Sequence, residues 1–326
     1  MIAIVVSVRK APYLALGLAL AGCLAGPEVP RVTTLTVGQW PEDLLLDPVS
    51  GRLFIADEGS ATVTVLSPTG ERVGTIRLVS RARHLAVDSG LGRVYAPNEG
   101  NGFIAGFDTR DLREAIRVPV GRQPHGIAVD SPTHRVFVAN EGDGSLTALD
   151  GRSGQVLFTA PVGRGPGGVA VDPATARVFV VLVKEDRVDV IDGARGLRIA
   201  AIPVGRGPTH LRINTKTGIV YVLNTEAGSV SILDGRALRV LVTLPVGNYP
   251  IGIAVDETAG RVYVVNNRGN TLSILDEAAR AVVGTRRIPR NVSSATLNPE
   301  AGLLYLALKS EDRVAVIRLS DLSTTY

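Results

Sequence analysis

The chain of 326 residues has few of the side chains that form cross-links or carry common chemistry: one cysteine, one methionine, one tryptophan and four histidines. With Cys23 as the only cysteine, no disulfide can form within the chain, so stability must come from a large packed core. The sequence also lacks the motifs GxSxG, HExxH, CxxC and GxxxxGK. Nucleophilic hydrolysis, zinc proteolysis, dithiol redox chemistry and nucleotide binding by a phosphate loop therefore have no support from contiguous motifs.

A strong charge imbalance and a helical period are absent as well. Without Arg9 and Lys10, which lie in the N-terminal segment, 33 basic and 31 acidic side chains remain. This near balance gives no reason to expect binding to nucleic acid or strong attraction to anionic lipid. Apolar residues recur at every second position, and glycine or proline interrupts the pattern every 8 to 12 residues, which predicts an all-β protein.

The chain consists mainly of one repeated segment, of which Val120 to Pro161 is a clear copy. Further copies begin in steps of 42 residues, with one step of 41, at Val37, Leu78, Val162, Val204, Val246 and Ile288. Within one copy, strands are expected at 126–130, 135–140, 145–150 and 155–162, separated by the turn sequences SPTH, EGDG and GRSG. Seven copies with this period predict seven four-stranded antiparallel blades of a β-propeller.

The second strands RVFVAN, RVYAPN, IVYVLN and RVYVVN are preceded by VGxxP and followed by a strand that ends in aspartate. In these features the chain from Arg31 to Tyr326 resembles the YVTN family of β-propeller repeats. That family and its relatives include envelope binding proteins, periplasmic proteins associated with redox metabolism, and a few enzymes. The resemblance therefore implies the fold and leaves the function open.

The two ends of the repeat region are expected to meet. Arg31 to Val37 has the pattern of a fourth strand, yet it precedes the first copy, whereas the last copy has only three strands. We expect the N-terminal strand to complete the last blade, which would pair two otherwise open sheet edges. Deleting residues 31–36 should then destabilise the whole ring.

The N-terminal segment combines Arg9 and Lys10, an apolar stretch over residues 11–22, and the tetrapeptide Leu-Ala-Gly-Cys that ends at Cys23. The apolar stretch is too short to span a bilayer as a helix. The segment resembles a bacterial lipoprotein signal peptide. This resemblance implies a signal peptide over residues 1–22, lipidation of Cys23, a tether over residues 23–30, and a propeller over residues 31–326 that is held at the cell envelope, facing the periplasm or the cell surface.

Some recurring residues are assigned to structure. One aromatic residue in each second strand should pack in the core: Phe54, Tyr95, Phe137, Phe179, Tyr221, Tyr263 and Tyr305. Aspartates that end third strands should bond to turn amides: Asp108, Asp150, Asp192, Asp234 and Asp276.

The loop before each first strand and the loop between strands two and three should open on one face, around the central channel. The candidate binding residues on this face are Asp43, His84, Asn98, Glu99, Arg122, His125, Asn140, Glu141, Arg206, His210, Arg212, Asn224, Glu226 and Asn266. Arginine, carboxylate and amide side chains could bind a polar ligand or a protein loop. The alternative is that they are solvated turn residues. Asp43, His84 and His125 could also hold a divalent metal, whereas His134 belongs to the opposite face.

Three functions follow as hypotheses. The favoured one is a lipid-anchored, monomeric envelope propeller without cofactor or catalysis that binds a protein partner or polar ligand on its channel face. The second is a propeller enzyme that resembles streptogramin lyases or lactonases and uses a channel histidine as base or metal ligand. The third, suggested by the family alone, is an accessory protein of periplasmic redox metabolism.

Overall fold

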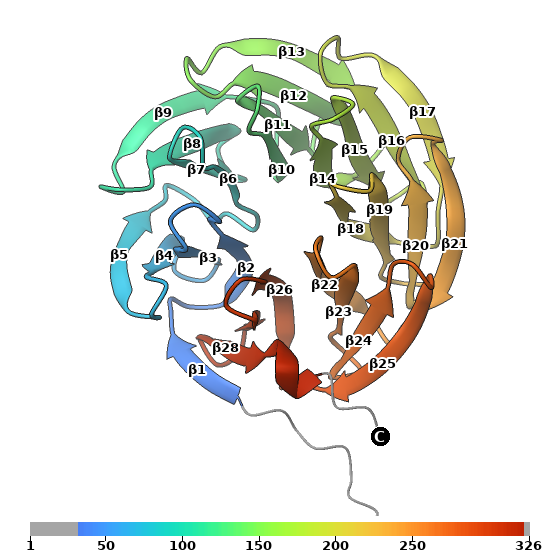
Figure 1. The fold of residues 1–326 in the computed structure, drawn as a ribbon. Coiled ribbons are helices and arrows are strands. Elements are labelled where there is room, and N and C mark those ends of the chain that lie inside the picture. Colours follow the sequence, from blue (N-terminus) through green and yellow to red (C-terminus); the bar gives the residue numbers. More distant parts are fainter. Residues whose placement is uncertain (1–31, 323–326) are drawn as a thin grey trace, which may run out of the picture.

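The computed structural model describes residues 32–322, which form seven four-stranded antiparallel sheets arranged as a ring around a central channel (Figure 1). The predicted signal peptide, Cys23 and tether lie outside the described residues. The predicted fold is confirmed: the period of the sequence is the period of the blades. A short 3-10 helix, Leu319–Leu322, follows the last strand and was not expected.

Each blade runs from an innermost strand at the channel to an outermost strand at the rim. Blade 1 contains β2 (Pro41–Leu46), β3 (Leu53–Asp57), β4 (Thr62–Leu66) and β5 (Arg72–Arg77). Blade 2 contains β6 (Ala86–Asp88), β7 (Arg93–Asn98), β8 (Phe103–Asp108) and β9 (Glu114–Pro119). Blade 3 contains β10 (Pro124–Asp130), β11 (Arg135–Asn140), β12 (Ser145–Asp150) and β13 (Val156–Pro161). Blade 4 contains β14 (Pro166–Asp172), β15 (Arg177–Leu182), β16 (Arg187–Asp192) and β17 (Arg198–Pro203).

The remaining blades follow the same order. Blade 5 contains β18 (Pro208–Asn214), β19 (Ile219–Asn224), β20 (Ser229–Asp234) and β21 (Arg239–Pro245). Blade 6 contains β22 (Pro250–Asp256), β23 (Arg261–Asn266), β24 (Thr271–Asp276) and β25 (Ala281–Arg287). Blade 7 contains β26 (Val292–Asn298), β27 (Leu303–Leu308), β28 (Arg313–Arg318) and, as its outermost strand, the N-terminal β1 (Val32–Thr36).

The ring is closed by the pairing of β1 with β28, from Val32 opposite Ile317 to Thr36 opposite Arg313. This confirms the predicted closure, in which the first strand of the chain completes the last blade. The open edges at the two ends of the chain thereby pair with each other, and the seven blades become one closed unit.

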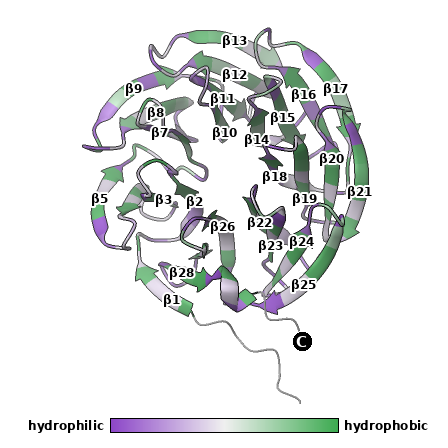
Figure 2. Cartoon of the chain, in the orientation of Figure 1, coloured by the Kyte–Doolittle hydropathy of each residue, from purple (hydrophilic) through white to green (hydrophobic). Residues whose placement is uncertain are grey.

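The core lies between the faces of neighbouring blades, where hydrophobic segments of the inner and middle strands meet (Figure 2). All seven predicted aromatic residues are buried, and the ring of Phe179 reaches under the turn glycine Gly235 of the next blade. Tyr95 additionally donates a hydrogen bond from its hydroxyl to the Gly151 carbonyl, 3.1 Å away in blade 3. These aromatic residues therefore join blades, as predicted.

The aspartates that end third strands also behave as predicted. Asp150 accepts hydrogen bonds from the backbone N–H groups of Arg152 and Ser153, at 2.9 and 2.8 Å. Asp192 and Asp234 make the same pair of bonds in their own turns. Their carboxylates hold local turns and lie away from the channel face.

Candidate functional site

The loops predicted to share the channel face lie side by side. In blade 3, the N–H of Glu141 donates to the Gln123 carbonyl at 3.0 Å, and the N–H of Gly142 donates to the Arg122 carbonyl at 3.0 Å. These bonds join the loop into the innermost strand to the loop between the second and third strands. Side chains from both loops of each blade therefore border one end of the channel.

Blade 2 departs from the repeat at this face. Its innermost strand, β6, has only three residues, whereas the other innermost strands have six or seven. At the repeat position of His84, blades 3, 4 and 6 have glycines, and a Cβ on Gly126 would lie only 2.0 Å from the Gly167 carbonyl oxygen. Glycine there lets neighbouring innermost strands pack closely. Blades 1 and 2 have Asp43 and His84 at this position instead, and β2 and β6 are hardly in contact.

Asp43 fills the space between these two blades. Its Oδ1 atom accepts hydrogen bonds from the Leu44 N–H and the Ser294 hydroxyl, both at 3.0 Å, and its Oδ2 atom accepts one from the Leu85 N–H at 3.1 Å. Burial alone would raise the pKa of Asp43, but His84, Arg212 and the Leu85 N–H stabilise the carboxylate and lower the pKa to about 2. Asp43 is thus a buried anion that connects blades 7, 1 and 2.

Three histidines from different blades meet at the entrance of the channel. The ring of His84 lies edge to face against His125, with centroids 4.8 Å apart, and against His210, with centroids 5.1 Å apart. We call His84, His125, His210 and the nearby Arg212 the throat. The sequence predicted these residues as candidates, and the fold brings them together.

Each throat histidine has a partner for its Nδ1 atom. His84 Nδ1 lies 3.6 Å from Asp43 Oδ2, and His125 Nδ1 lies 3.0 Å from Glu99 Oε1. Burial lowers the pKa of His210 well below its usual value, and the neighbouring His84 and Arg212 lower it further, so this imidazole is neutral. His134, as predicted, lies elsewhere: its Nδ1 atom is 2.7 Å from Asp88 Oδ2.

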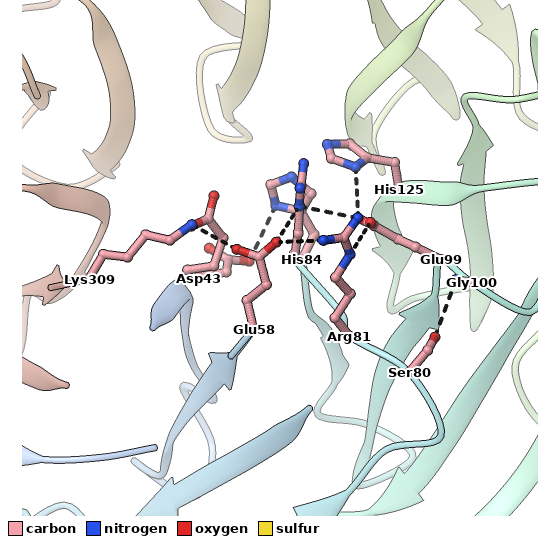
Figure 3. A network of polar contacts seen from close by, with 11 residues as sticks. Asp43, Glu58, Ser80, Arg81, His84, Glu99, Gly100, His125 and Lys309 are labelled. Carbon is pink, nitrogen blue, oxygen red and sulfur yellow. Dashed lines mark hydrogen bonds and ion pairs between the residues drawn. The ribbon is translucent and has the colours of Figure 1, made fainter. Parts of the chain in front are cut away.

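A network of ion pairs extends from the throat over the channel face of blades 7, 1 and 2 (Figure 3). Lys309 lies 2.6 Å from Glu42 Oε2 and 2.7 Å from Glu58 Oε2. Arg83 lies 3.0 Å from Glu58 and 3.8 Å from Glu99, which in turn contacts His125. Burial alone would raise the pKa of Glu99, but His125 and the two nearby arginines lower it. The network therefore holds Glu99 as an anion beside the throat.

A cleft of about 440 Å³ opens beside this network, over blades 2 and 3. Its lining consists of Ser80, Arg81, Arg83, Glu99, Gly100, Gln123 and Glu141. Arg81 remains 55% exposed although it lies 3.4 Å from Glu99, and Glu141 is also exposed. The cleft thus offers cationic, anionic and amide groups together, in a volume typical of sites for small ligands.

The four predicted asparagines require a correction. Asn98, Asn140, Asn224 and Asn266 are 0 to 1% exposed. Asn140 accepts a hydrogen bond from the Gly121 N–H at 3.1 Å and donates to the hydroxyls of Ser145 and Thr147. These amides connect segments inside the blades, so they are not available to a ligand on the channel face.

Several of the predicted arginines and glutamates are exposed to solvent. Arg122 is 79% exposed and forms an ion pair of 2.6 Å with Asp143. Arg206 and Glu226 are exposed on blade 5. Arg212 differs from them, because it is half-buried in β18. Of the predicted residues, Glu99 and Glu141 line the cleft, whereas Arg122 and Arg206 face solvent.

Residues 32–322 contain neither a cluster of metal ligands nor a membrane-spanning helix. No group of three or more histidine, cysteine, aspartate or glutamate side chains there is arranged to hold a metal ion. Asp43, one ligand of the hypothetical metal site, already accepts three hydrogen bonds. Within the same residues, no helix is long and apolar enough to cross a membrane.

Sequence reasoning missed Arg81, Arg83, Glu58, Lys309 and Gln123 as parts of this face. A signal was present for the first two. The VGxxP that begins most copies is replaced in copy two by the segment Leu78 to Ala82, so its innermost strand has no proline at the usual start. This local departure from the regular repeat is the sequence signal for the part of the face where Arg81 and Arg83 lie.

By its fold and its repeated sequence features, the protein is a β-propeller. The family described as YNCE-like beta-propeller matches residues 25–297, most of the chain, so the protein belongs to that family. Among solved structures, hydrazine synthase from Kuenenia stuttgartiensis is similar with a TM-score of 0.75 and 20% sequence identity, over 87% of this chain and 97% of that one. At that identity the likeness is one of fold. No curated protein matched in sequence.

Proposed function

We propose that this protein is a lipid-anchored propeller of the bacterial cell envelope that binds a small polar ligand at its channel face without transforming it. The observation that carries the proposal is the 440 Å³ cleft beside the shortened β6, lined by Arg81, Glu99, Gln123 and Glu141. Most of the ring is regular packing, and here the shortened innermost strand of blade 2 leaves charged groups at the channel.

The chemistry of the cleft favours a ligand with several polar groups. Arg81 offers N–H donors, Glu141 offers acceptors, and the Gln123 amide offers both. Arg83 and Glu99 are held by the ion-pair network, so the site is formed before a ligand arrives. A preformed site loses little entropy on binding, which strengthens the binding of a small molecule.

The ligand can be sought directly. Purified protein would be incubated with the small-molecule fraction of its source cells, washed and denatured, and the released compounds identified by mass spectrometry. We expect at least one polar compound to be enriched on the natural protein and lost from a variant carrying Arg81→Ala and Gln123→Ala. The matched control is Arg122→Ala, an exposed arginine outside the cleft lining. Equal recovery from both variants would contradict the proposal.

The lipid anchor rests on the sequence around Cys23 alone. It predicts that the protein expressed in a bacterium partitions into the detergent phase and incorporates a labelled fatty acid. A Cys23→Ser variant should do neither, because the acyl chains supply the membrane affinity. Unchanged partitioning of this variant would show that the protein is not held by a lipid on this residue.

An enzyme that uses a throat histidine as general base is the second candidate. It is favoured by the three imidazoles at the channel entrance, since a base must reach the proton that it removes. In that case, the compound recovered from wild-type protein would be chemically changed over time, and a His84→Gly variant would bind it without changing it. A role in redox metabolism draws only on the fold-level likeness to hydrazine synthase.

A further inference from the structure

The hydrogen bonds around His210 determine which of its nitrogens carries the proton. Thr225 donates its hydroxyl hydrogen to the Pro250 carbonyl at 2.7 Å. The 2.6 Å contact between Thr209 and Thr225 must therefore be donated by Thr209. The Thr209 oxygen then accepts from His210 Nδ1, which is 3.0 Å away, so the proton is on Nδ1.

The same assignment holds for the other two rings. His125 Nδ1 faces the carboxylate of Glu99 at 3.0 Å, and His84 Nδ1 lies 3.6 Å from that of Asp43, so both favour a proton on Nδ1. Within residues 32–322, none of the three Nε2 atoms has a hydrogen-bond partner. None of them is fully buried either, so each is accessible to solvent. In its neutral form each throat histidine therefore presents an Nε2 lone pair to the open channel.

Arg212 brings a cation to the same place. It follows His210 by two residues in β18, so the two side chains share a face of the strand. The other blades have Leu45, Ala86, Ala128, Ala170, Ala254 and Thr296 at this repeat position. Within residues 32–322, the only hydrogen bond of the guanidinium goes to the Leu211 carbonyl, at 3.2 Å, and it forms no ion pair. A half-buried guanidinium that stabilises the Asp43 carboxylate only from a distance, without a direct ion pair, can still bind an anion.

We propose that the throat binds the carboxylate of a small hydroxy- or amino-carboxylate through Arg212, while the imidazoles accept hydrogen bonds from the ligand's hydroxyl or ammonium groups. This inference rests on the proposed function and names the class of its ligand. Glu99 connects the two parts, because it lines the cleft and bonds to His125. A ligand whose carboxylate lies in the throat can therefore extend its polar groups into the cleft.

The test follows the ring nitrogens of ¹⁵N-histidine-labelled protein by NMR during titration with D-gluconate, tartrate and L-serine. Acetate supplies a carboxylate without donors, sorbitol supplies hydroxyls without a carboxylate, and inorganic phosphate supplies a different oxyanion. We expect at least one of the three hydroxy- or amino-carboxylates to shift the Nε2 signals of the throat histidines and to bind more tightly than acetate, sorbitol and phosphate. If none of the three shifts these signals at tens of millimolar, or if phosphate or acetate binds as tightly as the best of them, the inference is wrong.

Two variants complete the test. Arg212→Ala introduces the residue found in four other blades, so it should fold, and it should weaken binding about tenfold or more, the effect of a lost charged hydrogen bond. Arg206→Ala, an exposed arginine of the same blade, should bind as the natural protein does. Equal affinities of natural protein and Arg212→Ala would overturn the inference. The proposed function would survive that result if the Arg81→Ala, Gln123→Ala variant still lost the compound recovered from cells.

Discussion

Glu99 in blade 2 holds the ring of His125 in blade 3, with 3.0 Å between Oε1 and Nδ1. The same carboxylate lies 3.4 Å from Arg81 and 3.8 Å from Arg83. It thus fixes the orientation of a throat histidine and the position of two cleft arginines. Neighbouring parts of the proposed site share this one anion.

We expect Glu99→Ala to lower the free energy of unfolding by about 2 kcal/mol, because it removes charged hydrogen bonds from a mostly buried site. Glu99→Gln keeps an acceptor for His125 and should lose about half as much. Urea unfolding at pH 7 would measure both. Equal losses would show that the charge of Glu99 does not matter.

The contact between Glu99 and His125 also predicts how stability depends on pH. The folded-state pKa of Glu99 is lowered from 4.5, so its stabilisation is present above pH 4.5 and is lost as the pH falls through the folded value. The difference in stability between natural protein and Glu99→Gln should therefore shrink in acid. A difference that grows below pH 4 would contradict this sign.

Arginines at the start of second strands connect successive blades. Arg177 in blade 4 donates from Nη1 to the carbonyls of Gly235 and Arg236 in blade 5, both at 2.8 Å. Arg135 makes the corresponding bond to the Gly193 carbonyl at 3.0 Å. We expect Arg177→Ala to cost about 1 to 3 kcal/mol of unfolding free energy.

The control for Arg177→Ala is Arg195→Ala, in which an arginine 75% exposed loses a surface ion pair with Asp192. Such pairs contribute little, so this variant should change stability by less than about 0.5 kcal/mol. Denaturant unfolding of the two proteins gives the comparison. If both variants lose the same amount, the bonds between blades 4 and 5 are not what stabilises this junction.

The sequence was sufficient to predict the architecture, because the repeat specifies one supersecondary unit seven times and each unit repeats the same turns and buried positions. It did not reveal the bonds from Arg135 and Arg177. These arginines begin a strand pattern, and their acceptors are carbonyls 58 residues away in the next blade, which no side-chain pattern marks.

The site was predictable in part. The throat histidines could be identified because each lies at or beside the start of an innermost strand. The asparagines were misassigned, because a turn asparagine that faces a ligand and one that bonds inside its own blade have the same sequence pattern. Lys309 and Glu58 were missed, since they meet only when the ring closes and blade 7 comes beside blade 1.

Ring closure gives a prediction of its own. Deleting residues 1–36 removes β1, exposes β28 and leaves blade 7 with three strands. Because the deletion opens the ring, we expect it to lower the melting temperature of the whole protein in one transition. Deleting residues 1–30 keeps β1 and should leave melting unchanged. If the protein without residues 1–36 showed a separate transition at lower temperature, blade 7 would unfold on its own. Ring closure would then not couple the blades.

Asp57 predicts a pH effect of the opposite sign. It occupies the repeat position of the four buried asparagines and is 1% exposed. Burial raises the pKa of this carboxyl to about 6, although hydrogen bonds from Thr64, Thr62 and the Gly38 N–H partly offset the effect. The folded state therefore holds a proton that the unfolded state releases above pH 3.8.

The contribution of Asp57 to the free energy of unfolding is therefore fully present below pH 3.8. It declines by on the order of 2 to 3 kcal/mol as the pH rises to about 6. Asp57→Asn, which introduces the residue of four other blades, should remove this decline and make the protein more stable than the natural one at pH 8. Asp111→Asn, at an exposed turn, should leave the decline in place. The melting temperatures of all three proteins would be measured from pH 4 to pH 8. If the natural protein gained stability relative to Asp57→Asn as the pH rose, Asp57 would be ionised in the fold and the prediction would be wrong.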